Sequence, residues 1–223
     1  MVIDVEGIVI NTKNYGDTSK IIDILTKEYG IIGVMAKGCK SLKSNLRSVT
    51  DKLTYANFTI YYKKDKLSIL SEASVINNFS NIKKDIEKIS YASFLLDLTN
   101  QVYKQNNDND LYNLLIIALI KINNNFNPMV ITNIIELKYL DYLGVMPILD
   151  GCSICGSKSV ITLSSDKGGY LCNKCRNNEP IVTDKAIKLV RMYTLVDISK
   201  ISKLDLNIDV VREVNRFIDD YYD

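Results

Sequence analysis

Hydrophobic and polar residues alternate over the first 78 residues in the manner of β-strands. Short β-branched stretches are separated by turn sequences such as KEYG and KKDK, and no apolar period of helix length lies between them. We expect five strands, at residues 3–12, 20–26, 31–37, 53–62 and 66–76. Because an open sheet of this size would leave strand edges unpaired, the pattern favours a small closed barrel.

From residue 81 onward the apolar spacing becomes helical. Ile82, Ile86 and Ile89 begin a period of three to four residues that continues to Gln105. Further helices are expected over residues 111–122, 129–143, 184–193 and 209–222. The helix over 129–143 is apolar on several sides, which predicts that it lies in the centre of a helical bundle.

Four of the five cysteines form two C-x2-C pairs with sixteen residues between the pairs. These four, the candidate ligands of a metal ion, are Cys152, Cys155, Cys172 and Cys175. This spacing is typical of a zinc ribbon, in which each pair places two thiolates at about 2.3 Å from one ion. The intervening ITLSSDKGGYL predicts a β-hairpin. Four protein ligands leave no open coordination position, so we predict one structural Zn²⁺ per chain.

Two other interpretations of these cysteines stay open at this point. A thiol oxidoreductase needs only one C-x2-C pair. An iron–sulfur cluster also takes four cysteines, although the ferredoxin spacings differ from this one. The fifth cysteine, Cys39, stands alone in a basic segment and is expected to be an ordinary thiol.

Composition narrows the possible classes of protein. The chain has 223 residues, a net charge of +2, no histidine and no tryptophan. The lack of histidine excludes Ser-His-Asp and Cys-His catalysis and mixed Cys/His metal sites. The amino terminus has no basic n-region, and the longest apolar run, residues 114–120, is too short to span a bilayer. We therefore expect a cytoplasmic protein without a membrane partner.

Positive charge gathers in the segment KGCKSLKSNLR, residues 37–47, which we call the basic loop. Its basic residues are Lys37, Lys40, Lys43 and Arg47, and no acid follows before Asp51. A second cluster begins at Lys63, and the nearby aromatic residues are Tyr15, Tyr55, Tyr61 and Tyr62. Small barrels bind single strands with cations along the backbone and bases stacked on aromatic rings. The alternative is a solvated loop over tyrosines of the barrel core.

Three short motifs occur in order along the chain. They are Tyr15-Gly16-Asp17, Ala36-Lys37-Gly38, and Leu143-Gly144 with Pro147 just before Cys152. Together with the order of barrel, helices and cysteine segment, they resemble the RecO family of bacterial recombination mediators over essentially the whole chain. The resemblance implies an α+β multidomain fold with an OB-type barrel over residues 1–79. It further implies a helical domain over 80–149 and 179–223, with a zinc-binding insert over 150–178.

The same resemblance implies a DNA repair accessory protein that is not an enzyme. Members of the family bind single- and double-stranded DNA, anneal complementary strands and assist recombinase loading onto DNA coated by single-strand-binding protein. The implied partners are RecR, often RecF, and the acidic-hydrophobic C-terminal tail of single-strand-binding protein, with a nucleoid-associated location. The expected DNA contacts are Lys37, Lys40, Lys43 and Arg47, with Lys20 and Lys63 as further candidates. The alternative function is a zinc-ribbon protein-interaction module that never touches nucleic acid.

Overall fold

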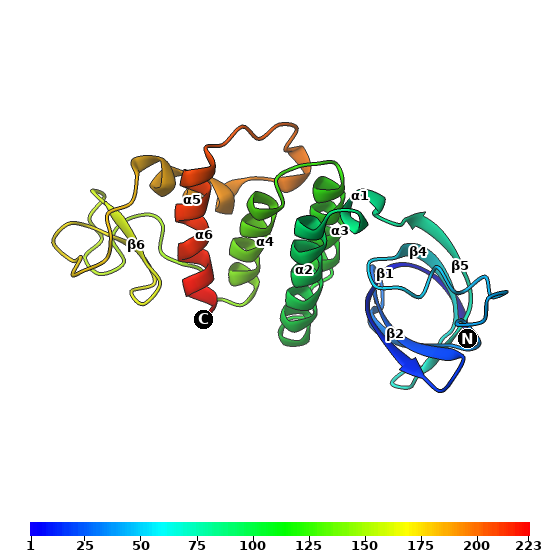
Figure 1. Cartoon of the computed structure of the whole chain (residues 1–223). Helices are drawn as coiled ribbons and strands as arrows, with labels where there is room; N and C mark the ends of the chain where they lie inside the picture. Colours follow the sequence, from blue (N-terminus) through cyan, green and yellow to red (C-terminus); the bar gives the residue numbers. More distant parts are fainter. The chain divides into compact units, whose positions relative to one another are not determined.

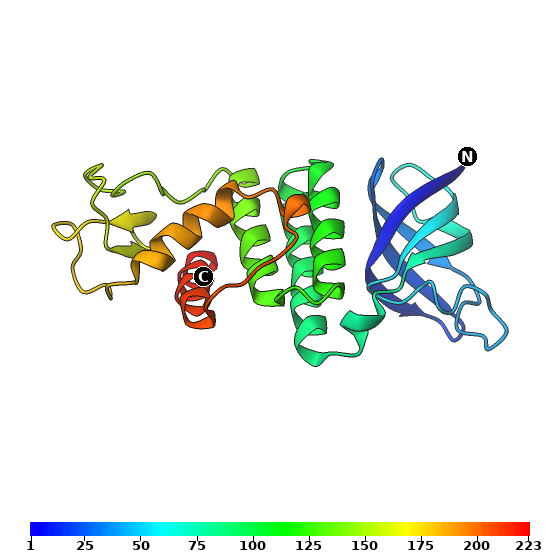
Figure 2. The same ribbon diagram turned by 90° about the horizontal axis from the view of Figure 1, so that it is seen from above.

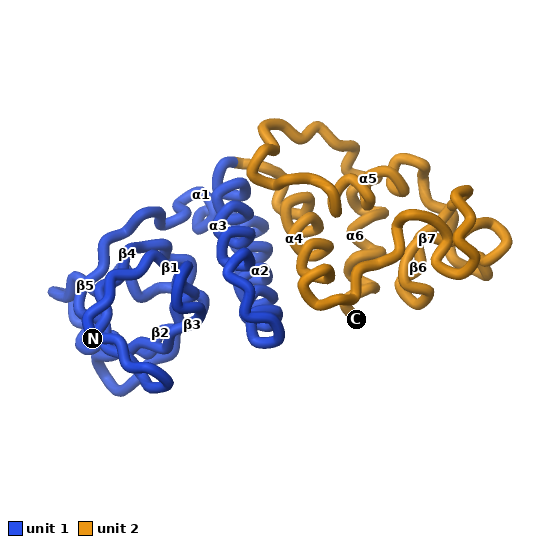
Figure 3. The backbone as a smooth tube through the Cα atoms, turned by 180° about the vertical axis from the view of Figure 1, so that it is seen from behind, with its two compact units in different colours: residues 1–124 blue, residues 125–223 orange.

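The computed structural model describes residues 1–223, which separate into two compact units (Figure 3). We call Met1–Asn124 the barrel unit and Asn125–Asp223 the ribbon unit. The division into three domains that the sequence suggested, with boundaries after residues 79, 149 and 178, stays a prediction.

The first five strands close into a barrel in the order β1-β2-β3-β5-β4 (Figure 1). Their bounds are Val2–Tyr15 (β1), Ser19–Thr26 (β2), Gly30–Ala36 (β3), Tyr55–Tyr61 (β4) and Ser68–Asn77 (β5). Neighbouring strands are antiparallel except β3 and β5, which are parallel. This closed five-stranded barrel is of the OB type, and the fold predicted from the alternating pattern is confirmed.

The long strand β1 makes the barrel curve. Its first half pairs with β4 and its second half with β2, and the register shifts between Val9 and Asn11. A Cβ atom added at Gly7 would lie 2.6 Å from Ile24 Cγ2 and 2.9 Å from the carbonyl oxygen of Leu25. Glycine therefore permits a close approach of β1 and β2 that a larger residue would prevent.

Three helices complete the barrel unit: Ser80–Lys83 (α1), Ile86–Gln105 (α2) and Asp110–Asn123 (α3). Helices α2 and α3 run side by side in Figures 1 and 2. The single helix predicted from residue 81 to 105 is wrong, because the chain breaks at Asp85. The Asp85 carboxylate accepts hydrogen bonds from the backbone N–H groups of Glu87 and Lys88 at 3.0 and 3.1 Å, and so caps a new helix.

Glu6 of β1 joins the barrel to these helices. Its Oε1 atom accepts hydrogen bonds from the hydroxyl groups of Tyr55, at 2.5 Å, and of Tyr112 in α3, at 2.9 Å. The bond from Tyr55 outweighs the effect of burial and lowers the pKa of the Glu6 carboxyl. Lys52 and Asp97 of α2 form an ion pair at 2.8 Å, which adds a second connection.

The ribbon unit contains helices and one small hairpin. The helices are Pro128–Tyr142 (α4), Asp184–Leu195 (α5) and Ile208–Tyr222 (α6), with a short 3-10 turn at Ile198–Lys200 (η1). Strands Thr162–Ser164 (β6) and Gly169–Leu171 (β7) form the hairpin. Helix α4 is buried on nearly all sides, in agreement with its apolar composition. No helix combines the length and apolar character that a membrane crossing requires.

Candidate metal centre and nucleic-acid interface

The sulfur atoms of Cys152, Cys155, Cys172 and Cys175 lie within 4.8 Å of one another. Cys155 Sγ and Cys172 Sγ are 3.6 Å apart, and all four cysteines are free of disulfides. In a tetrahedron with metal–sulfur bonds of about 2.3 Å, the sulfur atoms would be roughly 3.8 Å apart. The cluster therefore has the dimensions that a tetrahedral metal ion requires.

Two tight turns and the hairpin between them bring the cysteines together. The carbonyl oxygen of Cys152 accepts a hydrogen bond from the N–H of Gly156 at 2.8 Å, and Gly156 takes the left-handed conformation, with φ 74°. The carbonyl oxygen of Cys172 accepts from the N–H groups of Cys175 and Arg176, at 3.2 and 3.1 Å. The β6–β7 hairpin predicted from the sequence connects the two turns.

The turns favour a thiolate at two of the four positions. Burial acts to raise the pKa of the Cys152 thiol, but hydrogen bonds from the backbone around it lower that pKa to about 6. A backbone hydrogen bond from Cys175 lowers the pKa of the Cys172 thiol. Conversely, the hydrogen bond with the Cys155 side chain raises the pKa of Cys175 to about 12. The negative charge of neighbouring thiolates would be offset by a cation bound among them, so these donors fit a metal ion.

The basic loop is fixed against the barrel by its backbone. Lys40 N–H donates to the carbonyl oxygen of Thr18 at 2.9 Å, and Gly38 N–H donates to Ser19 Oγ at 3.2 Å, which holds the loop beside the β1–β2 connection. Two residues of the loop itself anchor it to the barrel: Cys39 is buried in the barrel core, and Leu46 packs against the same core. Cys39, which we expected to be an ordinary thiol in a basic segment, is thus part of the buried core, and its ordinary chemistry stays a prediction.

The basic side chains themselves point to solvent. The exposed residues are Lys37, Lys40, Lys43 and Arg47 on the basic loop and Lys63 on the β4–β5 connection. Lys20 differs, because its Nζ atom lies 2.8 Å from Asp51 Oδ1 and its side chain is only 18% exposed. Among the tyrosines, Tyr15 and Tyr61 are exposed. Tyr55 is buried and donates a hydrogen bond to Glu6, so the prediction that Tyr55 belongs to the aromatic surface is wrong.

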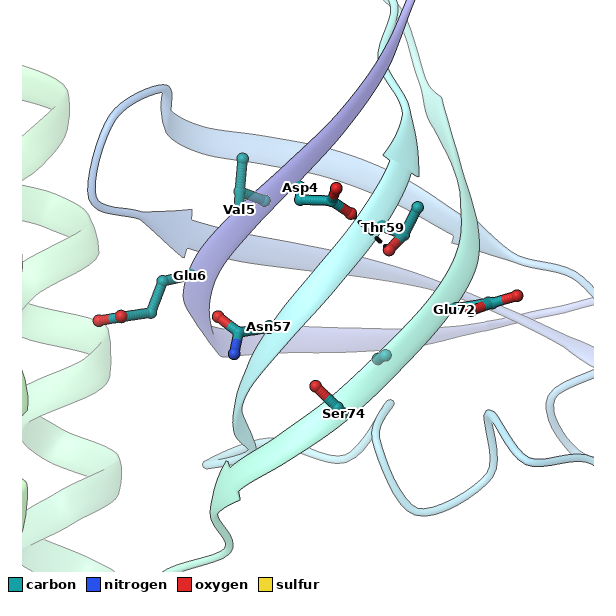
Figure 4. Close-up of a pocket in the computed structure, with 8 residues that line it drawn as sticks. Asp4, Val5, Glu6, Asn57, Thr59, Glu72 and Ser74 are labelled. Atoms are coloured by element: carbon teal, nitrogen blue, oxygen red, sulfur yellow. Dashed lines mark hydrogen bonds between the residues drawn. The ribbon is translucent and has the colours of Figure 1, made fainter.

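Acidic residues occupy a different part of the barrel, formed by β1, β4 and β5. A depression of about 330 Å³ is lined there by Asp4, Glu6, Asn57, Thr59, Glu72 and Ser74 (Figure 4). Asp4 accepts a hydrogen bond from Thr59 at 2.6 Å, while Glu6 is directed toward the neighbouring helix (Figure 4). Carboxylates repel phosphate, so this face is unfavourable for DNA and the basic loop is the favourable one.

Two family models together match almost the whole chain. One, described as Recombination protein O N terminal, matches residues 1–79. The other, described as Recombination protein O C terminal, matches residues 83–223. The chain belongs to the RecO family.

Curated RecO proteins support the same assignment. The DNA repair protein RecO of Listeria monocytogenes serotype 4b is 32% identical over 223 residues, which cover 98% of this chain and 87% of that protein. The relative from Halalkalibacterium halodurans is 33% identical with the same coverage. The relative from Bacillus pumilus is 31% identical over 228 residues, covering 100% of this chain and 89% of its own. Membership in the RecO family gives the chain a role in DNA repair and recombination.

The RecO assignment confirms the family resemblance seen in the sequence, and the structure brings the four predicted ligand cysteines together. The predicted DNA contacts stay a prediction. Sequence reasoning did not single out Tyr29, whose ring centroid lies 5.4 Å from that of Tyr62. Tyr29 belongs to the turn sequence KEYG, where a tyrosine gives no signal of its contact with a residue 33 positions away.

Proposed function

We propose that this RecO-family chain is a recombination mediator without catalytic chemistry of its own. It binds single- and double-stranded DNA, anneals complementary strands and assists recombinase loading onto DNA coated by single-strand-binding protein. Its protein partners are RecR, often with RecF, and the C-terminal tail of single-strand-binding protein. Family membership, together with the arrangement of charge on the barrel, supports this proposal.

The observation that carries the proposal is the basic loop. The turns that carry its exposed cations are hydrogen-bonded to Thr18 and Ser19. Cys39 and Leu46 of the same loop pack into and against the barrel core. OB-type barrels bind oligonucleotides on the face of strands 2 and 3 and on the loops between strands 1 and 2 and between strands 4 and 5. The basic loop directly follows β3 and is hydrogen-bonded to the β1–β2 connection at Thr18 and Ser19. Lysine acts as a point charge toward phosphate, so we expect binding without sequence preference. Neutralising the phosphates of two strands would let them approach and anneal.

The metal in the four-cysteine cluster is proposed to be one structural Zn²⁺ per chain. Sulfur-only donors at tetrahedral spacing suit zinc, and four protein ligands leave no position for a substrate or for reactive water. In this role Cys152, Cys155, Cys172 and Cys175 would tie the β6–β7 hairpin to the two flanking turns. In this proposal the metal stabilises the fold of the ribbon unit, and the DNA contacts belong to the barrel.

A groove in the ribbon unit supports the proposed contact with an acidic, hydrophobic tail. The groove, of about 340 Å³, lies beside α5 and the segment leading into α6, and its apolar floor includes Leu189, Met192 and Val210. The exposed Lys185 and Lys188 line the same groove, with Asp205 as the single acid. Apolar side chains of a tail would lie on the floor while its carboxylates meet the two lysines.

The proposal is tested by fluorescence anisotropy of labelled single-stranded DNA over a salt series, with zinc measured on the same sample. We expect about one zinc per chain, and a plot of log affinity against log salt with a slope of roughly −3, since each of four neutralised phosphates contributes about −0.7. Zinc without DNA binding at low salt would contradict the mediator proposal. That result would favour a zinc-ribbon module that binds only proteins.

A further inference from the structure

A pocket of about 430 Å³ lies between the β2–β3 and β4–β5 hairpins of the barrel, and no residue of the basic loop lines it. The β2–β3 hairpin contributes Tyr29 and Gly33, and the β4–β5 connection contributes Tyr62, Lys63, Lys66 and Leu67. OB-type barrels bind their ligands on the face of strands 2 and 3 and with two loops, one of which is the β4–β5 connection; the β2–β3 hairpin joins the two strands of that face.

One wall of the pocket is aromatic. The ring centroids of Tyr29 and Tyr62 are 5.4 Å apart, with the ring planes inclined by 51°. Tyr62 packs against the barrel core and is held in place, whereas Tyr29 is 41% exposed. A pair of rings fixed on one side and open on the other is a surface on which a flat aromatic ligand can stack.

A second wall is an open strand edge. β3 pairs with β5 only at Val34–Ser68 and Met35–Ile69, so the first half of β3, Gly30–Gly33, has β2 along one edge and no strand along the other. The backbone polar groups of such an edge need partners. The pocket therefore offers hydrogen-bonding groups beside the aromatic wall.

The charge at the rim is positive. Lys63, Lys66 and Asp65 line the pocket and Lys64 belongs to the same turn, so the turn carries three lysines and one acid. All three lysines are exposed. A ligand that combines a flat ring, a polar edge and an adjacent anion matches these three features, and that combination is a nucleotide.

We propose that this pocket holds one unstacked base of single-stranded DNA, with the adjoining phosphate on Lys63 and Lys66. The inference rests on the proposed function and adds a base-binding site to it. The ring lies against Tyr29 and Tyr62, and its polar edge meets the open edge of β3. Because a paired duplex does not present the face of a base, the pocket favours single strands over double strands. Every base has such a face, so sequence preference is weak.

Gly33 allows the pocket to be filled without changing its charge. A Cβ atom at Gly33 would lie 3.6 Å from Leu67 Cδ1 and 3.7 Å from Asp23 Oδ1, both ordinary contacts. Valine also suits a strand position. Gly33→Val should therefore fold and place its methyl groups toward Leu67 in the pocket, and Gly33→Ala is the matched control that adds only the first carbon. Thermal unfolding of both variants checks that the barrel is intact.

The experiment compares an oligothymidine with an abasic oligomer of the same length and phosphate count. We expect the natural protein to bind the oligothymidine roughly tenfold more tightly, the effect of stacking one base. Gly33→Val should abolish this preference while leaving abasic binding and its salt slope unchanged, and Gly33→Ala should keep the preference. Equal binding of both oligomers by the natural protein would overturn the base pocket while the proposed function stands. Binding of neither would overturn both.

The lack of tryptophan provides an independent readout. Tyr29→Trp introduces a single reporter into the pocket, and Phe94→Trp introduces one at a position on α2 that is 42% exposed. Stacking predicts that oligothymidine quenches the Tyr29→Trp fluorescence, that the abasic oligomer does not, and that Phe94→Trp responds to neither. A base preference that survives Gly33→Val, with no quenching, would place the base elsewhere and leave the β3 edge to an extended peptide.

Discussion

The barrel unit and the ribbon unit satisfy their buried polar groups in different ways. In the barrel unit, the Glu6 carboxylate accepts hydrogen bonds from two tyrosine hydroxyls, and the strands enclose one continuous apolar core. Buried side-chain atoms without a hydrogen-bond partner are more numerous in the ribbon unit, where they belong to Thr132, Asn133, Ser153, Arg176 and Tyr193, than in the barrel unit, where Thr12 Oγ1 is such an atom. The apolar cluster around the cysteines is also small, with Cys152, Leu171 and Cys172 as its buried members. The barrel unit is thus held by one apolar core and the Glu6 hydrogen bonds, whereas the ribbon unit combines a buried helical core, which includes Ile131, Ile134 and Val214, with a small separate cluster at the cysteines.

Two glutamates show the same contrast. Hydrogen bonding from Tyr55 lowers the pKa of Glu6. Glu136 in α4 is only 3% exposed, and burial, with a smaller contribution from the nearby Asp219 carboxylate, raises its pKa to about 8. Hydrogen-bond donors around a buried carboxyl group favour its charged form, whereas burial of the group by itself favours its protonated form. At neutral pH the folded ribbon unit therefore holds Glu136 mainly in its protonated form.

The largest expected effect is the loss of one cysteine ligand. Cys172→Ser should release the metal, because three thiolates no longer complete the tetrahedral site. Structural zinc sites contribute about 10–16 kcal/mol of apparent binding energy that is also folding energy, so the segment around the site should lose its structure. Hydrogen exchange should show the segment 150–178 losing protection while barrel amides keep theirs, and the metal content should fall to near zero. Cys39→Ala, at the buried cysteine of the barrel, is the control and should retain the metal. Full metal retention by Cys172→Ser would remove Cys172 from the ligand set.

The next effect is the pH dependence of the ribbon unit. The pKa of Glu136 is about 8 in the folded chain, whereas an ordinary glutamate has a pKa of 4.5, so folding takes up a proton at pH values between these two. The free energy of unfolding should therefore fall as pH rises from about 4.5 to 8, by roughly 3–5 kcal/mol in total. Glu136→Gln keeps the shape without the charge and should remove this slope. Denaturant unfolding from pH 5 to about 9 measures it, and an unchanged slope would contradict the assignment.

Glu6 provides the matched comparison in the barrel unit, with the opposite sign. Its lowered pKa means that the carboxylate contributes stability above the unfolded pKa and that this stability is lost as pH falls through the folded pKa. Glu6→Gln should therefore weaken the barrel at neutral pH and reduce its sensitivity to acid. A loss of stability that appeared only at alkaline pH would show that the tyrosine hydroxyls do not act on a charged Glu6.

Local patterns predicted much of this molecule. The spacing of Cys152, Cys155, Cys172 and Cys175 gave the metal cluster because two residues between ligands fix a turn by themselves. Alternation gave the barrel strands, since a strand with one buried face has a period of two. The break at Asp85 was missed because the apolar period continues across it, and only the hydrogen bonds of the carboxylate show the new helix start.

Contacts between distant residues could not be predicted. Lys20 was a further candidate for DNA contact, and nothing in the sequence indicated its ion pair with Asp51, 31 residues away. Cys39 lies among basic residues in the sequence but packs in the core, because the loop folds back over the barrel. The Tyr29–Tyr62 pocket requires two hairpins to meet at the closure of the barrel. Each of these features depends on tertiary geometry that neither composition nor spacing contains.

The basic loop should change binding without changing the fold. Lys40→Glu combined with Lys43→Glu removes two of the four phosphate contacts proposed for the basic loop, so the salt slope on single-stranded DNA should flatten by about 1.4, since each contact contributes about −0.7. Stability should stay the same because both side chains are exposed. Lys84→Glu with Lys104→Glu makes the same charge change at exposed positions outside the barrel strands and should leave the slope unaltered. A slope that also stays unaltered in the loop variant would exclude the loop from the interface.

The smallest effect is expected in the groove of the ribbon unit. Lys185→Glu with Lys188→Glu should weaken an acidic, hydrophobic tail peptide roughly two- to fivefold, because exposed charge pairs contribute little and salt screens them. Isothermal titration with the peptide measures this, and Lys203→Glu, exposed but outside the groove lining, is the control. Anisotropy on DNA should be unchanged in the same variant, since the proposed DNA contacts belong to the barrel unit. An equal loss of peptide and DNA binding would contradict this separation, because both ligands would then depend on one surface.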